Sequence, residues 1–309
     1  QTRHQIKTKH TYNPARRRIH FRSLRRFFLS LLKNTDHTPG PIGVFDSGYG
    51  GLTILRCIRR RLPEYSYLYL GDNARAPYGP RSFEVVLEFT LQAVRHLFAA
   101  GCQLVILACN TASAKALRSI QQEYLPGNAP DRRVLGVIRP TVEALPAVTR
   151  NGHVGLMATA GTVASHSYRM ETAKTDVRIR LTELACPLLV PLIENGEADS
   201  QGADWFVRKY TARLLQADPD IDTILLGCTH YPLIVDSIRR HVPANVRLLE
   251  QGPLVAESLA DYLCRHPEME SRCLRGADCR YLTTEEPGKF DTMATLFTGA
   301  PARSIRITL

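Results

Sequence analysis

The sequence contains no run of roughly 18 to 20 consecutive apolar residues, the length that a helix needs to cross the hydrocarbon core of a bilayer. It has no Cys-x-x-Cys pair, so it offers neither the usual redox motif nor the ligand spacing of a zinc finger. Its glycine cluster Gly48-Tyr-Gly-Gly51 matches neither G-x-G-x-x-G nor a phosphate-binding loop. These absences weigh against a membrane-spanning protein, a metalloprotein and a nucleotide-dependent enzyme.

The chain has enough material for one large or two ordinary domains, with 309 residues of which 44% are hydrophobic. Its eight cysteines are irregularly spaced and do not form a small disulfide scaffold, which predicts a reducing, cytoplasmic location. The late group Cys264, His266, Cys273 and Cys279 has the wrong gaps for a zinc site, so we expect no metal.

The net charge of +11 is concentrated near the N-terminus. Residues 1–40 hold ten Lys or Arg against one acidic residue, Asp36, and so carry nine of these charges. The rest is close to neutral, which makes a nucleic acid partner unexpected. We expect the basic extension to be disordered, and Phe27–Leu32 is too short for the core of a signal peptide. The alternative is an amphipathic helix that touches a membrane surface, a nucleic acid or a partner.

Short apolar runs alternate with helical patterns from Pro41 onward, which is typical of a parallel sheet covered on both faces. The predicted strands are 42–45, 67–70, 104–108, 134–138, 154–157, 179–184, 223–226, 246–249 and 279–282. The pattern repeats after Pro140, which predicts an α/β fold of two Rossmann-like lobes with the active cleft between them. We expect residues 41–134 and 250–309 to form the first lobe and residues 135–249 the second.

Two stretches of this pattern are nearly the same: Leu104-Val-Ile-Leu-Ala-Cys109-Asn-Thr111 and Thr223-Ile-Leu-Leu-Gly-Cys228-Thr229-His230. In each, an apolar strand leads through a small residue to a cysteine. Ligands of open α/β sheets bind beyond the carboxyl ends of the strands. The two cysteines are therefore expected to face each other across the cleft.

Other candidate residues have a structural interpretation beside the functional one. Asp46 follows the first predicted strand and either caps the next helix or takes part in catalysis. Tyr78 and Gly79 either belong to a simple proline turn or line the wall of the cleft. His230 is either structural or exchanges a proton with Cys228, two residues before it.

The thiols themselves allow several interpretations. A free cysteine is usually a small buried apolar residue, but the residues after Cys109 predict a helix start, where the pKa of a thiol falls. Disulfide exchange normally uses neighbouring cysteines, and these two lie far apart in the chain. Inverting a stereocentre next to a carboxylate instead needs one group to remove a proton from one face and another to return it to the opposite face.

With these residues the chain resembles the cofactor-independent glutamate racemases of the aspartate/glutamate racemase superfamily. The motifs are Ile42-Gly-Val-Phe-Asp46-Ser47-Gly48, Gly50-Gly-Leu-Thr53, Pro77-Tyr78-Gly79, Ala108-Cys109-Asn110-Thr111-Ala-Ser113, Val190-Pro191-Leu-Ile-Glu194 and Leu226-Gly-Cys228-Thr229-His230-Tyr-Pro232. The resemblance implies two pseudo-symmetric lobes and interconversion of L- and D-glutamate without pyridoxal phosphate. It also implies a cytoplasmic role that supplies D-glutamate for peptidoglycan. We further expect a homodimer.

Carried over residue by residue, the resemblance makes Cys109 the base that acts on D-glutamate and Cys228 the base that acts on L-glutamate. Asp46 would assist Cys109, and His230 with Glu194 would assist on the other side. The implied substrate contacts are Asp46, Ser47, Tyr78, Gly79, Asn110, Thr111, Thr229 and His230.

The chain departs from the family pattern in its basic extension, in Glu250-Gln251-Gly252 where Asp-Ser-Gly is commoner, and in Ala158, which replaces a usual glycine. A second hypothesis is a superfamily relative that acts on aspartate, a hydantoin or an arylmalonate. The last would be decarboxylated with a single thiol, so the presence of both cysteines favours glutamate. A third hypothesis is a binding protein whose basic extension contacts nucleic acid.

Overall fold

The computed structural model describes residues 38–309. The basic extension predicted for residues 1–40 lies outside this part of the chain, apart from its last three residues. None of the helices in residues 38–309 is long and apolar enough to cross a membrane.

The larger of two sheets has six strands in the order β10-β9-β2-β1-β3-β4, and all neighbours are parallel. Its strands are β1 (Ile42–Asp46), β2 (Tyr67–Gly71), β3 (Leu104–Leu107), β4 (Arg133–Gly136), β9 (Cys279–Thr283) and β10 (Ser304–Arg306). The end of the chain returns to this sheet, because β9 pairs with β2.

The smaller sheet has four parallel strands in the order β6-β5-β7-β8. They are β5 (His153–Ala158), β6 (Arg180–Ala185), β7 (Thr223–Gly227) and β8 (Arg247–Leu249). Two parallel sheets joined by crossover helices confirm the predicted α/β fold class.

Helices connect the strands throughout. They are α2 (Gly51–Arg61), α3 (Phe83–Ala99), α4 (Asn110–Lys115), α5 (Leu117–Ser119), α6 (Leu125–Asn128), α7 (Ile138–Val148), α8 (Ala160–Ala164), α9 (Ser167–Thr175), α10 (Leu189–Glu194), α11 (Gln201–Ala217), α12 (Val235–Arg240), α13 (Gln251–Arg265), α14 (Pro267–Glu270) and α15 (Pro287–Thr298), with 3₁₀ turns η1 (Asn73–Arg75) and η3 (Tyr231–Ile234) and a π-helical turn η2 (Ile120–Tyr124). The two longest, α3 and α11, each begin after a serine whose hydroxyl accepts a backbone N–H of the first turn.

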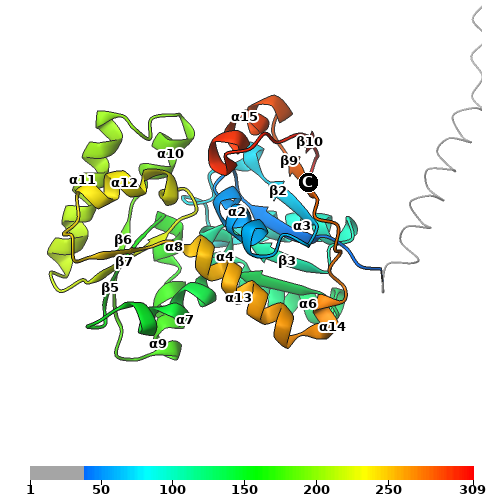
Figure 1. Ribbon diagram of the computed structural model, residues 1–309, viewed down its shortest axis with the longest axis horizontal. Coiled ribbons are helices and arrows are strands. Elements are labelled where there is room, and N and C mark those ends of the chain that lie inside the picture. Colours follow the sequence, from blue (N-terminus) through cyan, green and yellow to red (C-terminus); the bar gives the residue numbers. More distant parts are fainter. Residues whose placement is uncertain (1–37) are drawn as a thin grey trace, which may run out of the picture. The chain divides into compact units, whose positions relative to one another are not determined.

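Strands β1, β2, β3 and β7 are buried along their whole length, which explains why their residues are almost entirely apolar. Along β1, Val44 packs in one core cluster with side chains of α2, α13 and α15, while Phe45 packs in another with side chains of α3. Figure 1 shows α11 and α12 on one side of the smaller sheet and α7 and α9 on the other. The polar positions left at the strand ends are therefore free to form a site.

Some predicted element bounds are wrong. A strand was expected over 134–138, but β4 ends at Gly136 and α7 begins at Ile138. The helix expected after Cys109 is interrupted at Ala116, which separates α4 from α5 and the π-helical turn. The predicted lobe boundary at residue 134 falls within β4, and the division into 41–134 with 250–309 and 135–249 stays a prediction.

Candidate active site

The two cysteines stand at matching places in the two sheets. Strand β3 leads to Cys109 and β7 leads to Cys228, and each of these strands pairs with the first strand of its half, β1 or β5. The registers place Asp46 beside the residue that precedes Cys109, and Ala158 beside Gly227, the residue that precedes Cys228. The halves thus share a scaffold, but only the first carries an acid at this point.

Both thiols line one cavity of about 160 Å³, with Cys109 6% exposed and Cys228 5% exposed. The predicted residues on its wall are Ser47, Tyr78, Gly79, Cys109, Asn110, Thr111, Glu194, Cys228, Thr229 and His230. Asp46 is the one predicted residue that does not line it. Among the described residues on the wall there is no lysine or arginine, so His230 is the only side chain there that can carry a positive charge.

Cys109 is the N-cap of α4, and its Sγ accepts the N–H of Ala112 at 3.4 Å and lies 3.3 Å from Ser47 Oγ. Burial, and to a smaller extent Asp46, raise the pKa of the thiol to about 12, although the hydrogen bonds with Ser47 and Ala112 act to lower it. The N–H of Ala112 at the helix start does lower this pKa, but burial outweighs it, so the predicted fall in the pKa of the thiol is wrong. With only six residues, α4 offers a small dipole against a nearly complete loss of solvent.

Asp46 ends β1 and is 1% exposed. Its Oδ2 accepts the N–H of Gly48 at 2.9 Å, whereas Oδ1 accepts no hydrogen bond from any residue in 38–309. Burial raises the pKa of this carboxyl, and His230 opposes the increase. Asp46 therefore holds a proton more readily than an exposed aspartate does.

On the other side, His230 lies between Cys228 and Glu194. Its Nδ1 is 3.8 Å from the Cys228 sulfur and its Nε2 is 2.8 Å from Glu194 Oε1, at the end of α10. Burial alone lowers the pKa of His230, but its contacts with Cys228 and Glu194 outweigh it and raise this pKa to about 10. The imidazole is thus protonated at neutral pH and can donate towards the sulfur.

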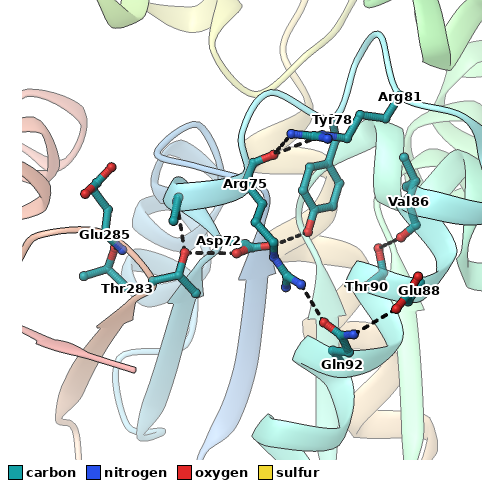
Figure 2. Close-up of polar contacts among 12 residues, drawn as sticks. Asp72, Arg75, Tyr78, Arg81, Val86, Glu88, Thr90, Gln92, Thr283 and Glu285 are labelled. Carbon is teal, nitrogen blue, oxygen red and sulfur yellow. Dashed lines mark hydrogen bonds and ion pairs between the residues drawn. The ribbon is translucent and has the colours of Figure 1, made fainter. Parts of the chain in front are cut away.

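Tyr78 lines the cavity with its hydroxyl already engaged. The hydroxyl donates to Asp72 Oδ2, which also accepts from Arg75 Nε at 2.7 Å, while Thr284 Oγ1 lies 2.9 Å from Asp72 Oδ1. Figure 2 shows the ring of Tyr78 turned so that its oxygen points to Asp72. Burial and Asp72 keep the pKa of Tyr78 well above its usual value, so what Tyr78 offers a substrate is its ring and backbone.

Gly79 and Thr111 lie against Thr159, a residue of the second half that was not among the predicted site residues. Thr159 caps α8, its hydroxyl lies 3.0 Å from Thr111 Oγ1, and a Cβ added at Gly79 would lie 3.3 Å from Thr159 Cβ. Thr159 follows β5 as Ser47 follows β1, a strand-end signal that could have identified it. Cys186, directly after β6, also lines the cavity and has the same kind of strand-end position.

The loop that carries Thr229 lies against the start of α2. Thr53 Oγ1 donates to the Thr229 carbonyl at 2.9 Å. A Cβ added at Gly50 would lie 2.2 Å from Thr229 Oγ1 and 2.5 Å from His230 Nδ1. Glycine at residue 50 therefore allows the two halves to approach this closely.

Known proteins resemble this chain along most of its length. Residues 51–259 match the family described as Asp/Glu/Hydantoin racemase. The chain belongs to this family. A glutamate racemase of Dinoroseobacter shibae is 44% identical to this racemase over 266 residues, which cover 83% of this chain and 94% of the relative. The resemblance inferred from the motifs is confirmed.

Solved structures of glutamate racemases resemble this racemase along most of their length. An isoform from Bacillus anthracis superposes with a TM-score of 0.80 at 32% identity, over 88% of this chain and 99% of that one. The enzyme of Francisella tularensis, solved in complex with D-glutamate, gives a TM-score of 0.76 at 29% identity, over 88% and 98% of the two chains. The two-lobe racemase fold is thus common to all three.

Proposed function

We propose that this racemase interconverts L- and D-glutamate by a two-base proton transfer at the α-carbon, without a cofactor. The observation that carries the proposal is that Cys109 and Cys228 follow equivalent strands of the two sheets and line the same small cavity. A substrate held between them would present opposite faces of its α-carbon to the two sulfurs.

In the direction from D- to L-glutamate, the Cys109 thiolate removes the α-proton and the Cys228 thiol gives a proton to the opposite face. The roles exchange in the reverse direction. Asp46 is the group that can take the proton of the Cys109 thiol, because its buried carboxyl has a raised pKa. His230, held by Glu194, keeps a proton available beside Cys228.

Neutral donors would hold the two carboxylates of the substrate. We assign this to the hydroxyls of Ser47, Thr111 and Thr229, the amide of Asn110 and the backbone at Gly79. All lie on the cavity wall. The carboxylates of Asp46 and Glu194 are the acidic groups close to the site and would favour the ammonium group of the substrate.

Incubation of the protein with L-glutamate in D₂O, with no added cofactor, tests the proposal. We expect loss of optical activity by circular dichroism together with deuterium uptake at the α-carbon. Cys109→Ala and Cys228→Ala should each abolish racemisation. Full activity in either variant would refute the two-base assignment, and dependence on pyridoxal phosphate would refute the cofactor-free reaction.

Aspartate and arylmalonates are the competing substrates. Decarboxylation of an arylmalonate needs one thiol, so the second cysteine on the same wall favours racemisation. Assays of aspartate racemisation and of CO₂ release from phenylmalonate under the same conditions separate these reactions. Either activity exceeding that on glutamate would replace the proposal.

We also propose that the D-glutamate formed supplies peptidoglycan synthesis in the cytoplasm. We propose further that the protein acts as a homodimer. In each subunit, residues 41–134 with 250–309 would form one lobe and residues 135–249 the other. Family membership supports the biosynthetic role. Complementation of a bacterial strain that requires D-glutamate tests that role, and light scattering tests the dimer. A monomer in solution would refute the oligomeric state alone.

A further inference from the structure

The side-chain amide of Asn110 is held by two other side chains. Asn110 begins α4, lines the cavity next to Cys109 and is 3% exposed. Its Nδ2 donates to Gln251 Oε1 at 2.6 Å, and its Oδ1 accepts from the Tyr168 hydroxyl at 2.6 Å. The orientation of this amide decides whether it offers a substrate a donor or an acceptor.

These three side chains form a closed ring of hydrogen bonds. Gln251 Nε2 donates to the Tyr168 oxygen at 2.8 Å, Tyr168 donates to Asn110, and Asn110 donates back to Gln251. All three residues are buried. An unsatisfied buried polar group costs about 1–3 kcal/mol, so breaking any hydrogen bond of the ring is unfavourable.

A ring running in the opposite direction would satisfy the same three side chains, so another contact must fix its direction. The second N–H of Gln251 Nε2 is shared between Thr141 Oγ1, at 3.0 Å, and the Val137 carbonyl, at 3.4 Å. The Thr141 hydroxyl donates to that carbonyl at 2.7 Å. Turning the Gln251 amide over would bring its oxygen against the Val137 oxygen, two acceptors with no proton between them.

The direction of the ring determines what Asn110 presents. Its Oδ1 and one N–H are used within the ring, and its second N–H makes no hydrogen bond to any residue between 38 and 309. A carboxylate is an acceptor only, so an N–H is the group that it can use. The ring also joins the two halves, since Tyr168 lies on α9, after β5, and packs with residues of that strand.

We propose that Gln251 and Tyr168 are positioning residues that hold Asn110 as an N–H donor for a substrate carboxylate. Neither Gln251 nor Tyr168 lines the cavity, so both act through Asn110. This proposal rests on the proposed racemisation of glutamate.

Steady-state kinetics of Gln251→Met and Tyr168→Phe test the proposal. We expect the KM for glutamate to rise about 10- to 100-fold, the range for losing a hydrogen bond to a charged group, with a smaller change in kcat. In an Asn110→Ala background, Gln251→Met should leave KM unchanged, because its effect passes through the missing amide. Tyr168→Phe removes the hydroxyl but keeps the aromatic side chain, so it tests the proposal even if Gln251→Met does not fold.

Thr211→Val is the matched control, because Thr211 is fully buried in α11 and bonds only backbone carbonyls of its own helix. It should lower the thermal midpoint without changing KM. An unchanged KM in both ring variants, or an equal rise in KM with and without Asn110, would overturn the positioning role. Absence of glutamate racemisation in the wild-type protein would instead overturn the proposed function, so the two failures are distinguishable.

Discussion

Glu194 Oε1 lies 2.8 Å from His230 Nε2 and leaves the other ring nitrogen facing the Cys228 sulfur. Burial would lower the pKa of His230, but its two neighbours raise it from 6.5 to about 10. The Glu194–His230 pair therefore keeps a proton on the imidazole, beside the Cys228 thiol. It also makes the stability of the fold depend on pH.

The first prediction concerns that dependence. Because the folded-state pKa is raised, the stabilisation is fully present below about pH 6.5 and is lost as the pH rises to about 10. We expect the free energy of unfolding to fall across this window, by on the order of a few kcal/mol, and to fall less in Glu194→Gln. Urea titrations followed by circular dichroism measure this. Equal slopes in the two proteins would contradict the assignment.

The second prediction concerns Asp46. Asp46→Asn keeps the shape of the side chain but removes the group that can take the Cys109 proton, and we expect kcat/KM to fall about 10²- to 10⁴-fold. The fall must be equal in both directions, because enantiomers have equal free energies. Asp222→Asn is the control, since Asp222 is also buried but accepts hydrogen bonds from Thr149 and Thr223 and does not line the cavity. A similar loss of activity in the control would mean that both changes act through the fold.

The third prediction follows from the raised pKa of Cys109, about 12. At neutral pH the thiolate is scarce and the sulfur is buried, so iodoacetamide should modify Cys109 slowly. Cys264 is the exposed thiol among the described cysteines and should react first. Peptide mass spectrometry over a time course measures the order. Modification of Cys109 at the rate of Cys264 would show that its thiolate is available without substrate.

The fourth prediction concerns the contact between α2 and the Thr229 loop. A methyl group at residue 50 would overlap Thr229 Oγ1 and His230 Nδ1, so Gly50→Ala should displace His230 and lower kcat about 10²-fold or more, the least that proton transfer by a positioned group typically contributes. Gly127→Ala is the control, because a Cβ there meets no atom within 4 Å. If Gly50→Ala retains full activity, the loop must be able to move away without cost.

Much of this site follows from the sequence because parallel strands place their ends along one edge. Cys109, Cys228 and Asp46 were predicted from the residues that follow apolar runs, and all three lie at the strand ends. Thr159 has the same kind of position, and its counterpart Ser47 in the other half could have identified it.

The rest depends on distances that no local pattern contains. The ring of Asn110, Tyr168 and Gln251 joins residues up to 141 positions apart. The pKa of Cys109 depends on how completely the surrounding elements exclude water, and that outweighs the helix start visible in the sequence. The edge strand β10 has three residues, with Ile305 exposed, and lacks the apolar run that reveals a buried strand.

Among residues 38–309, no lysine or arginine lines the cavity wall, and this bears on turnover. His230, the cationic group there, is already paired with Glu194, so an anionic ligand is held by hydrogen bonds that water can replace. Such a site does not bind either enantiomer very tightly. Weak binding of the ground state leaves more of the interaction energy for the transition state. A reaction whose product is the mirror image of its substrate needs this, because the site that admits one enantiomer must also release the other.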